Sequence, residues 1–316
     1  MRHRPLGKSG LKVSVLGLGS WTTFGGSVDM RGARALVHHA FERGINFFDT
    51  ADVYLNGAGE QALGAAIADL PRHRLVVASK CFFPMSDDVN DRGLSRKHVH
   101  ESVDMSLRRL GTDYLDLYQC HRFDPDTPVH ETAAAMDDLV RRGKVLYWGV
   151  SMWPAERITE VVELCRRERM HAPVSNQPVY NLYERDIEAA VVPASERAGV
   201  GQVVYSPLAQ GVLSGKYGPA GTAPEGTRAA DPRFGRFVER FLTPERRAMA
   251  MRYVEWARVS GRDPLVTALA FCLRVPNVAS AIVGARSTEQ LDALLPAGDV
   301  ELDAAAVADL ERMFPA

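Results

Sequence analysis

Four ionisable side chains lie where short apolar segments of the sequence end. Asp49 ends one segment, and Tyr54 follows it by five residues. Lys80 and His121 end the next two segments. A phenol with a pKa of about 10 is a poor acid or base at neutral pH unless a nearby cation stabilises its phenolate. A lysine would lower the phenol's pKa, an aspartate would keep the lysine charged, and a histidine would position a substrate oxygen. This set suits proton delivery to a carbonyl oxygen while a hydride reaches its carbon.

Each residue also has an ordinary structural explanation. An aspartate at a strand end is typical of a loop anchor, and Lys80 alone is typical of a solvated charge. Tyr54 fits a loop aromatic equally well, and His121 fits a hydrogen-bonded structural residue. Spacing alone fits a shared catalytic site and a structural ion-pair network equally well, because both perturb titratable groups in similar ways.

Eight segments rich in β-branched and aromatic residues alternate with helical patterns. We expect strands at 13–18, 45–49, 75–78, 114–118, 145–150, 174–177, 200–205 and 279–283. From the second segment to the seventh, successive starts are 30, 39, 31, 29 and 26 residues apart. A strand with its crossover helix takes about 30 residues or more, so this spacing predicts repeated βα units.

Capping residues mark two of the intervening helices. Ser95 can cap a helix that ends at Gly111, and Asp29 or Ser27 can cap another that ends before Gly44. In both cases a predicted strand follows the glycine within a few residues. That order is typical of the αβ connections of a parallel sheet.

Repeated βα units form either a closed barrel or a doubly wound open sheet. No G-x-G-x-x-G follows the first predicted strand, so we expect an α/β fold of the (β/α)8 TIM-type barrel class. We expect residues 1–316 to form a single domain, with a short hairpin at 4–12 that could plug the bottom of the barrel. The C-terminal strand ends of a barrel share one rim, and neighbouring strands are about 4.8 Å apart. The four ionisable residues should therefore lie within about 10 Å of one another.

A long loop is expected after the seventh strand. Residues 210–236 are rich in Gly, Pro and Ala and show no periodicity, which predicts a mobile excursion. A lid over the site and a tolerated surface insertion fit this composition equally well.

Composition excludes several classes of protein. The chain has 316 residues, 46% apolar and 24% charged, and a formal net charge of −1. These values are typical of globular proteins and give no basic field for nucleic acid or an anionic membrane. No stretch approaches the roughly 20 apolar residues that span a bilayer. We therefore expect neither kind of partner.

Cysteines and histidines point away from disulfides and metals. Four cysteines without a C-x-x-C pair predict buried free thiols in a reducing compartment, so we expect a cytoplasmic protein. His98 and His100 lie two residues apart on a predicted helix and face different directions. No metal site is predicted.

Seven motifs carry a resemblance to a known family. They are LGKSGL at 6–11, FDTA-x-x-Y at 48–54, GLSRKH at 93–98, YWGVS at 147–151, SPLA at 206–209, SGKY at 214–217, and GARS at 284–287 followed by EQL at 289–291. With these motifs the sequence resembles the aldo-keto reductases over nearly its whole length. Within them it is most similar to the branch that contains the β-subunits of voltage-gated potassium channels and their bacterial relatives.

The resemblance implies a barrel that binds NADPH in an extended pose without a Rossmann fold. The family's catalytic aspartate, tyrosine, lysine and histidine fall on Asp49, Tyr54, Lys80 and His121. In the channel β-subunits the last of these positions is typically asparagine. His121 therefore favours an active reductase.

Contacts to the cofactor and the substrate are implied by the same resemblance. Expected cofactor-binding residues are Ser20, Trp21, Ser151, Gln177, Tyr205, Ser206, Leu208, Gln210, Lys216, Gly284, Arg286 and Gln290. The expected substrate pocket is formed by Trp21, Phe83, Arg122, Phe123 and Trp153. Ser151 and Gln177 match carboxamide contacts, and Tyr205 matches a ring stacked on the nicotinamide. Because an arginine can grip a 2′-phosphate with two parallel hydrogen bonds, Arg286 favours NADPH over NADH.

The expected function is NADPH-dependent reduction of a small aldehyde or ketone to an alcohol, with Tyr54 as general acid. Two alternatives remain open at this point. One is an NADPH-binding, redox-sensing accessory protein with little turnover. The other is a sugar-phosphate isomerase or lyase that uses Lys80 as a Schiff base. The sequence leaves formation of a homo-oligomer open.

Overall fold

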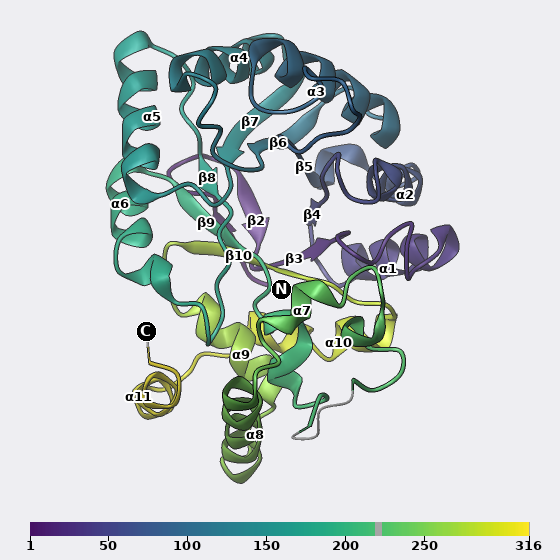
Figure 1. The fold of residues 1–316 in the computed structure, drawn as a ribbon, viewed down its shortest axis with the longest axis vertical. Coiled ribbons are helices and arrows are strands. Elements are labelled where there is room, and N and C mark those ends of the chain that lie inside the picture. Colours follow the sequence, from purple (N-terminus) through teal and green to yellow (C-terminus); the bar gives the residue numbers. More distant parts are fainter. Residues whose placement is uncertain (219–222, 316) are drawn as a thin grey trace.

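A closed parallel barrel lies at the centre of the protein. The structure is a computed structural model that describes residues 1–218 and 223–315. Within them the barrel strands are β3 (Leu16–Gly19), β4 (Phe47–Asp49), β5 (Val76–Cys81), β6 (Leu115–Cys120), β7 (Val145–Val150), β8 (Ser175–Asn176), β9 (Gly201–Val204) and β10 (Val278–Val283). β10 pairs with both β9 and β3 and closes the ring. The expected (β/α)8 barrel is confirmed (Figure 1).

Helices surround this barrel in Figure 1. They are α1 (Met30–Glu42), α2 (Ala58–Ile67), α3 (Arg96–Leu110), α4 (Val129–Arg141), α5 (Ala155–Glu168), α6 (Val191–Ala198), α7 (Arg236–Glu239), α8 (Pro244–Val259), α9 (Pro264–Leu273), α10 (Thr288–Asp292) and α11 (Ala304–Met313). The predicted caps are confirmed: Asp29 accepts from the backbone N–H of Gly32, and Ser95 from that of His98. Gly111 ends α3 with a φ of 64°, a conformation that costs glycine little.

An N-terminal hairpin closes one end of the barrel. β1 (His3–Pro5) pairs antiparallel with β2 (Lys12–Ser14). The predicted strand 13–18 is therefore corrected: its start belongs to the hairpin, and only Leu16 onward joins the barrel. A continuous apolar run does not reveal where the pairing partner changes. Leu6 and Val13 pack against interior barrel residues, so the hairpin plugs the bottom as expected.

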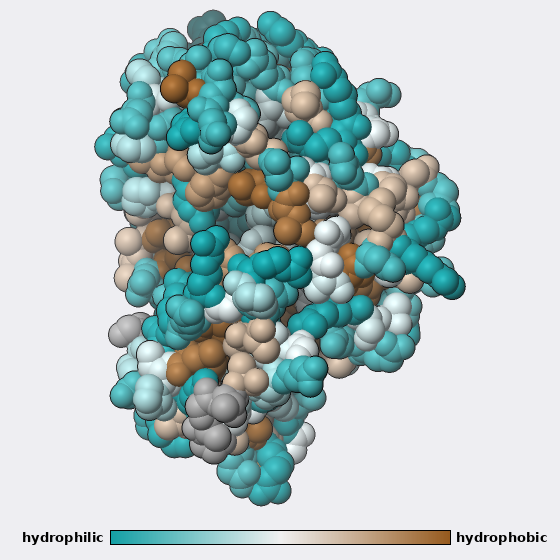
Figure 2. Space-filling model, turned by 45° about the vertical axis from the view of Figure 1, so that its right-hand side comes forward, coloured by the Kyte–Doolittle hydropathy of each residue, from teal (hydrophilic) through white to brown (hydrophobic). Residues whose placement is uncertain are grey.

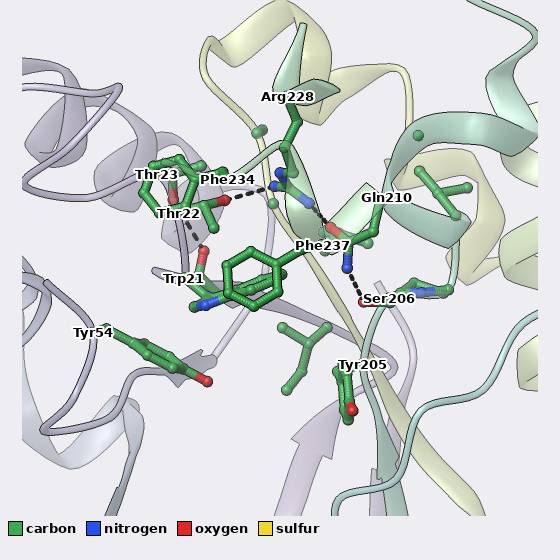
Figure 3. Close-up of a pocket in the computed structure, with 18 of the residues that line it drawn as sticks. Trp21, Thr22, Thr23, Tyr54, Tyr205, Ser206, Gln210, Arg228, Phe234 and Phe237 are labelled. Carbon is green, nitrogen blue, oxygen red and sulfur yellow. Dashed lines mark hydrogen bonds between the residues drawn. The ribbon is translucent and has the colours of Figure 1, made fainter. Parts of the chain in front are cut away.

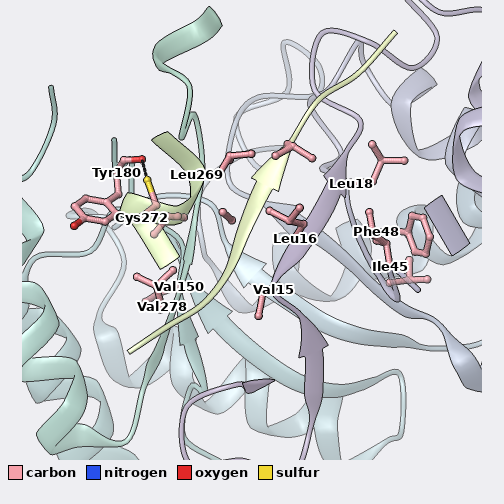
Figure 4. Close-up of a cluster of buried hydrophobic side chains, with 14 of the residues drawn as sticks. Val15, Leu16, Leu18, Ile45, Phe48, Val150, Tyr180, Leu269, Cys272 and Val278 are labelled. Carbon is pink, nitrogen blue, oxygen red and sulfur yellow. Dashed lines mark hydrogen bonds between the residues drawn. The ribbon is translucent and has the colours of Figure 1, made fainter. Parts of the chain in front are cut away.

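Strand residues alternate between the barrel interior and the surrounding helices. Phe48 and Val77 belong to the outer cluster beneath the helices, whereas Phe47 and Val76 belong to the interior cluster. Figure 4 shows part of the outer cluster, where Leu269 and other side chains gather between α9 and the barrel strands. Consecutive residues of a strand point to opposite faces, which explains this division. All four cysteines are buried and free, as expected.

The segment after β9 contains short helical turns. 3-10 helices span Ala209–Ser214 and Arg228–Ala230, and α7 follows. Part of the predicted irregular loop, residues 219–222, lies outside the described residues. Across the described ranges, no helix has both the length and the apolar character needed to cross a bilayer.

Candidate active site

Side chains alternate between the two faces of a strand, and this alternation directs Asp49 and Lys80 into the barrel. Each follows an interior apolar residue by two positions, Phe47 in β4 and Ala78 in β5. Residues two apart in a strand point to the same face, so both polar side chains stand above the apolar plug. Asp49 is 3% exposed and Lys80 is fully buried. Their charges are therefore held largely away from water.

Lys80 joins the other polar groups at this level. Its Nζ donates to Oδ2 of Asp49 at 2.7 Å, to the backbone oxygen of Thr50 at 2.7 Å and to the phenolic oxygen of Tyr54 at 3.2 Å. The second carboxylate oxygen of Asp49 accepts from Nε2 of Gln177 at 2.9 Å. The buried ion pair is thus supplied with further hydrogen bonds, which such a pair needs to be tolerated.

His121 stands beside the tyrosine. The two rings meet edge to face, with centroids 5.7 Å apart and an interplanar angle of 75°. Nδ1 of His121 is buried and has no hydrogen-bond partner within the described residues. Tyr54 and His121 both line the same cavity. The four residues that the sequence singled out therefore meet at one end of the barrel.

Burial and charge act on these groups in different directions. Burial raises the pKa of Tyr54 above its ordinary value, although the charge of Lys80 pulls it down. We expected Lys80 to lower this pKa, but removing the phenol from water has the larger effect. Burial opposes the charge on Lys80, yet Asp49 and Tyr54 together raise the pKa of its ammonium. Burial, with Lys80 and Arg122 nearby, holds the pKa of His121 well below its usual range. At neutral pH the phenol thus keeps its proton, and the histidine is uncharged.

A cavity of about 1060 Å³ opens above these residues. Trp21 and Phe237 form part of its wall, and their ring centroids are 5.0 Å apart. In Figure 3 Tyr54 and Tyr205 approach the cavity from opposite sides. Figure 2 shows hydrophobic residues gathered around a hollow on an otherwise mainly hydrophilic face. The cavity can hold a ligand much larger than a simple carbonyl compound.

Lys216, Arg228 and Arg286 line the cavity and pair with no carboxylate of the described residues. Burial lowers the pKa of Lys216, and both arginines lower it further. Burial and the charge of Arg286 lower the pKa of Arg228 to about 10, against the opposing effect of Tyr217. Like charges that lie close together are unfavourable unless an anion joins them. This end of the cavity fits the phosphate groups of a dinucleotide.

Most of the expected cofactor-binding residues line this cavity. They are Trp21, Ser151, Gln177, Tyr205, Ser206, Leu208, Gln210, Lys216, Gly284, Arg286 and Gln290. The Ser151 hydroxyl donates to the backbone oxygen of Gln177 at 2.8 Å. Ser20 lies outside the lining, because its hydroxyl donates to that of Thr50 at 2.8 Å and it is almost fully buried.

The expected substrate-pocket residues divide into two groups. Trp21, Phe83 and Arg122 line the cavity. Phe123 and Trp153 lie outside its described walls and pack against each other, with ring centroids 5.1 Å apart. Trp153 instead lines a separate cavity of about 210 Å³. Position just after a barrel strand was therefore not enough to place a side chain in the large cavity.

Sequence reasoning missed a bridge across the cavity. Arg228 donates to Oγ1 of Thr22 at 2.7 Å and also to the side-chain oxygen of Gln210 (Figure 3). Thr22 follows β3 and Gln210 follows β9, so the arginine joins the loops that come after two different strands at the same rim of the barrel. Phe234 and Phe237 line the cavity close by. The alternating Arg-Phe-Gly-Arg-Phe sequence at 233–237 was a signal that could have drawn attention to this segment.

Strained backbone accompanies the cavity. Thr22, Leu55, Ser206 and Gln210 line it and have φ values of 63°, 51°, 55° and 59°. Left-handed conformations of residues other than glycine persist only where the surrounding structure enforces them, and they gather at functional sites. Their grouping here is a second, independent mark of a functional cavity.

Comparison with known proteins agrees with the geometry. Residues 15–314 match the model of the Aldo/keto reductase family, and the chain belongs to that family. It is 38% identical over 312 residues to the probable voltage-gated potassium channel subunit beta of Arabidopsis thaliana, covering 95% of this chain and 92% of that protein. The protein of the same description from Oryza sativa subsp. japonica is 39% identical over 312 residues, with the same coverages. A putative voltage-gated potassium channel subunit beta of Schizosaccharomyces pombe is 38% identical over 296 residues, 91% of this chain and 85% of that protein.

Proposed function

We propose that this protein is an NADPH-dependent reductase that converts an aldehyde or ketone into an alcohol. The hydrogen bond from Lys80 to Tyr54 carries the proposal, because it sets a proton-bearing phenol beside a cation at the inner end of the cavity. NADPH, when bound, would supply the hydride for the carbonyl carbon. The cations Lys216, Arg228 and Arg286, which pair with no carboxylate of the described residues, support binding of its phosphates.

Each polar residue has a part in the proton transfer. Tyr54 donates its proton to the carbonyl oxygen as negative charge develops there. The charge of Lys80 stabilises the phenolate that remains, and Asp49 keeps Lys80 charged. His121 is neutral and stands edge-on to the phenol, so it can hold the carbonyl oxygen in line without competing for the proton.

The Tyr54→Phe variant tests this assignment. The ring and its packing remain while the proton donor is lost, so turnover should fall about 10²-fold or more. Binding of NADPH, followed by fluorescence quenching, should change little. Turnover is measured as loss of nicotinamide absorbance with a panel of aldehydes. Tyr114→Phe is the matched control, because Tyr114 lies under the guanidinium of Arg72 and outside the cavity lining. Unchanged turnover in Tyr54→Phe would refute the role of this residue.

The names of the relatives favour a second candidate function. Three of them are described as voltage-gated potassium channel β-subunits, which fits an accessory protein that binds NADPH and turns over little. His121 argues against this candidate, because the resemblance implies asparagine at that position in channel subunits. A purified protein that binds NADPH but oxidises it with no aldehyde of a broad panel would favour the accessory role.

A further inference from the structure

Arg122 brings a positive charge to the catalytic end of the cavity. It follows His121 directly, lines the cavity and is half-buried. Its guanidinium donates to the backbone oxygen of His121 at 2.5 Å and lies 5.3 Å from the ring centroid of Phe83. A carbonyl oxygen and an aromatic ring orient the guanidinium, but neither neutralises its charge.

No carboxylate of the described residues pairs with this guanidinium. Asp49 is the one carboxylate that lines the described part of the cavity, and it is already bound to Lys80. The charge of Arg122 acts on its surroundings, because it adds to the effect of burial in lowering the pKa of His121 and opposes the effect of burial that raises the pKa of Tyr54. The catalytic end of the cavity therefore presents an uncompensated cation beside the proton donor.

The phosphate-binding cations lie on the other side of the barrel. Lys216 and Arg228 follow β9, and Arg286 follows β10. In the ring of eight strands β6 is four places from β10 and three from β9, so Arg122, which comes after β6, lies across the barrel from these cations. A dinucleotide whose phosphates bind Lys216, Arg228 and Arg286 leaves Arg122 free to bind another anion.

The surroundings of Arg122 indicate the chemistry of that anion. The Phe83 ring lies 4.9 Å from that of His121, so an apolar surface connects the guanidinium to the catalytic histidine. A guanidinium binds a planar carboxylate through two parallel hydrogen bonds. A flat compound with a carbonyl at one end and a carboxylate at the other would match this arrangement.

We propose that the substrates of this site are carbonyl compounds that also carry a carboxylate, and that Arg122 binds this carboxylate while the carbonyl oxygen meets Tyr54. The inference rests on the proposed reductase function and adds the substrate class. Arg122 is then the residue that selects acidic substrates over neutral ones.

The test compares 2-, 3- and 4-carboxybenzaldehyde with their methyl esters in the NADPH-loaded enzyme. The wild-type protein should prefer at least one acid over its ester by tenfold or more in kcat/KM. In Arg122→Gln this ratio should fall at least tenfold, mainly through a higher KM for the acid, because ground-state binding is lost. Arg122→Lys keeps the charge and should restore part of the preference, which separates loss of charge from loss of folding.

Arg157→Gln is the matched control. This arginine also lies over an aromatic ring, 4.8 Å from the centroid of Phe123, but it is outside the cavity lining and pairs with Glu160. It should leave the acid-to-ester ratio unchanged. Equal use of acids and esters by the wild type, or an unchanged ratio in Arg122→Gln, would overturn the inference while the reductase function stands.

Absence of turnover with every aldehyde would instead count against the proposed function. The substrate inference is then judged by binding of benzoate and benzamide to the protein saturated with NADP⁺, followed by fluorescence of Trp21 in the cavity wall. Tighter binding of benzoate that weakens tenfold in Arg122→Gln supports the anion site. Equal binding of the two compounds overturns it.

Discussion

The ammonium of Lys80 donates a hydrogen bond of 3.2 Å to the phenolic oxygen of Tyr54, at the level where the barrel interior changes from apolar to polar. The same ammonium also balances the buried carboxylate of Asp49 at 2.7 Å. One cation thus balances the buried carboxylate and, in the proposed mechanism, prepares the phenol for proton transfer. These two roles can be separated by mutation.

Lys80→Met should destabilise the protein by about 3–5 kcal/mol, because the buried Asp49 carboxylate loses its partner. The double variant Lys80→Met with Asp49→Asn should recover part of that free energy of unfolding. Turnover should remain at least about 10²-fold low in both variants, since the phenolate of Tyr54 has no cation beside it. Urea denaturation and nicotinamide absorbance give the two readouts. Recovery of turnover in the double variant would show that Lys80 acts only as a counterion.

The rate of carbonyl reduction should depend little on pH between about pH 6 and pH 9. Burial and the nearby cations hold the pKa of His121 well below its usual 6.5, so this histidine stays neutral across the range. Burial raises the pKa of Tyr54 above its usual 10, so the phenol keeps the proton that it must donate. The decline should appear only on the alkaline side. A profile of kcat/KM with an acidic limb near pH 6.5 would contradict the neutral histidine.

Asp52 should make the protein less stable as the pH rises. It is fully buried and accepts from the Ser102 hydroxyl at 3.0 Å. Burial, with Glu60 nearby, raises the pKa of Asp52 from 3.8 to about 7. The unfolded chain therefore loses this proton first, and the stability present below pH 3.8 is lost progressively until about pH 7.

Asp52→Asn removes this titration. The rise of the pKa from 3.8 to about 7 corresponds to roughly 4 kcal/mol at most, and about two thirds of it falls above pH 5, so the loss of stability between about pH 5 and pH 8 should shrink by roughly 3 kcal/mol. Urea denaturation at both pH values measures the difference. Asp87→Asn in an exposed loop is the control and should leave the pH dependence as it is. An identical slope in wild type and Asp52→Asn would show that Asp52 does not titrate in this range.

The barrel and the positions of the four central residues could be predicted because both depend on local pattern. Asp49 and Lys80 stand at strand ends, and the two-residue period of a strand sets the direction in which they point. The spacing of these residues fits a catalytic site and an ion-pair network equally well, and the family motifs favoured the catalytic roles. The free-thiol prediction succeeded for a similar reason, since it needed only counts and spacing.

Features that depend on long-range packing could not be predicted. Val13 belongs to the hairpin because its pairing partner is Arg4, which the apolar run does not reveal. Trp153 packs on Phe123 away from the large cavity, although it follows a barrel strand. Burial raises the pKa of Tyr54 and the charge of Lys80 lowers it, and only the folded structure shows which effect is larger.

The last prediction concerns the arginine bridge over the cavity. Arg228 donates to Thr22 at 2.7 Å and also to Gln210, and thereby ties the segment after β9 to the loop after β3. In the proposed complex with NADPH, the cofactor would lie beneath this bridge and leave when the bridge opens. Arg228→Ala removes both hydrogen bonds and one phosphate-binding charge, so NADPH should dissociate roughly tenfold faster, the equivalent of about 1.4 kcal/mol. Stopped-flow fluorescence during displacement by excess NADP⁺ measures the rate.

Arg258→Gln is the control, because Arg258 is exposed and pairs with Glu255 on α8. This variant should release NADPH at the wild-type rate. Equal rates in all three proteins would mean that the bridge does not control release, whereas faster release in both variants would trace the effect to overall charge.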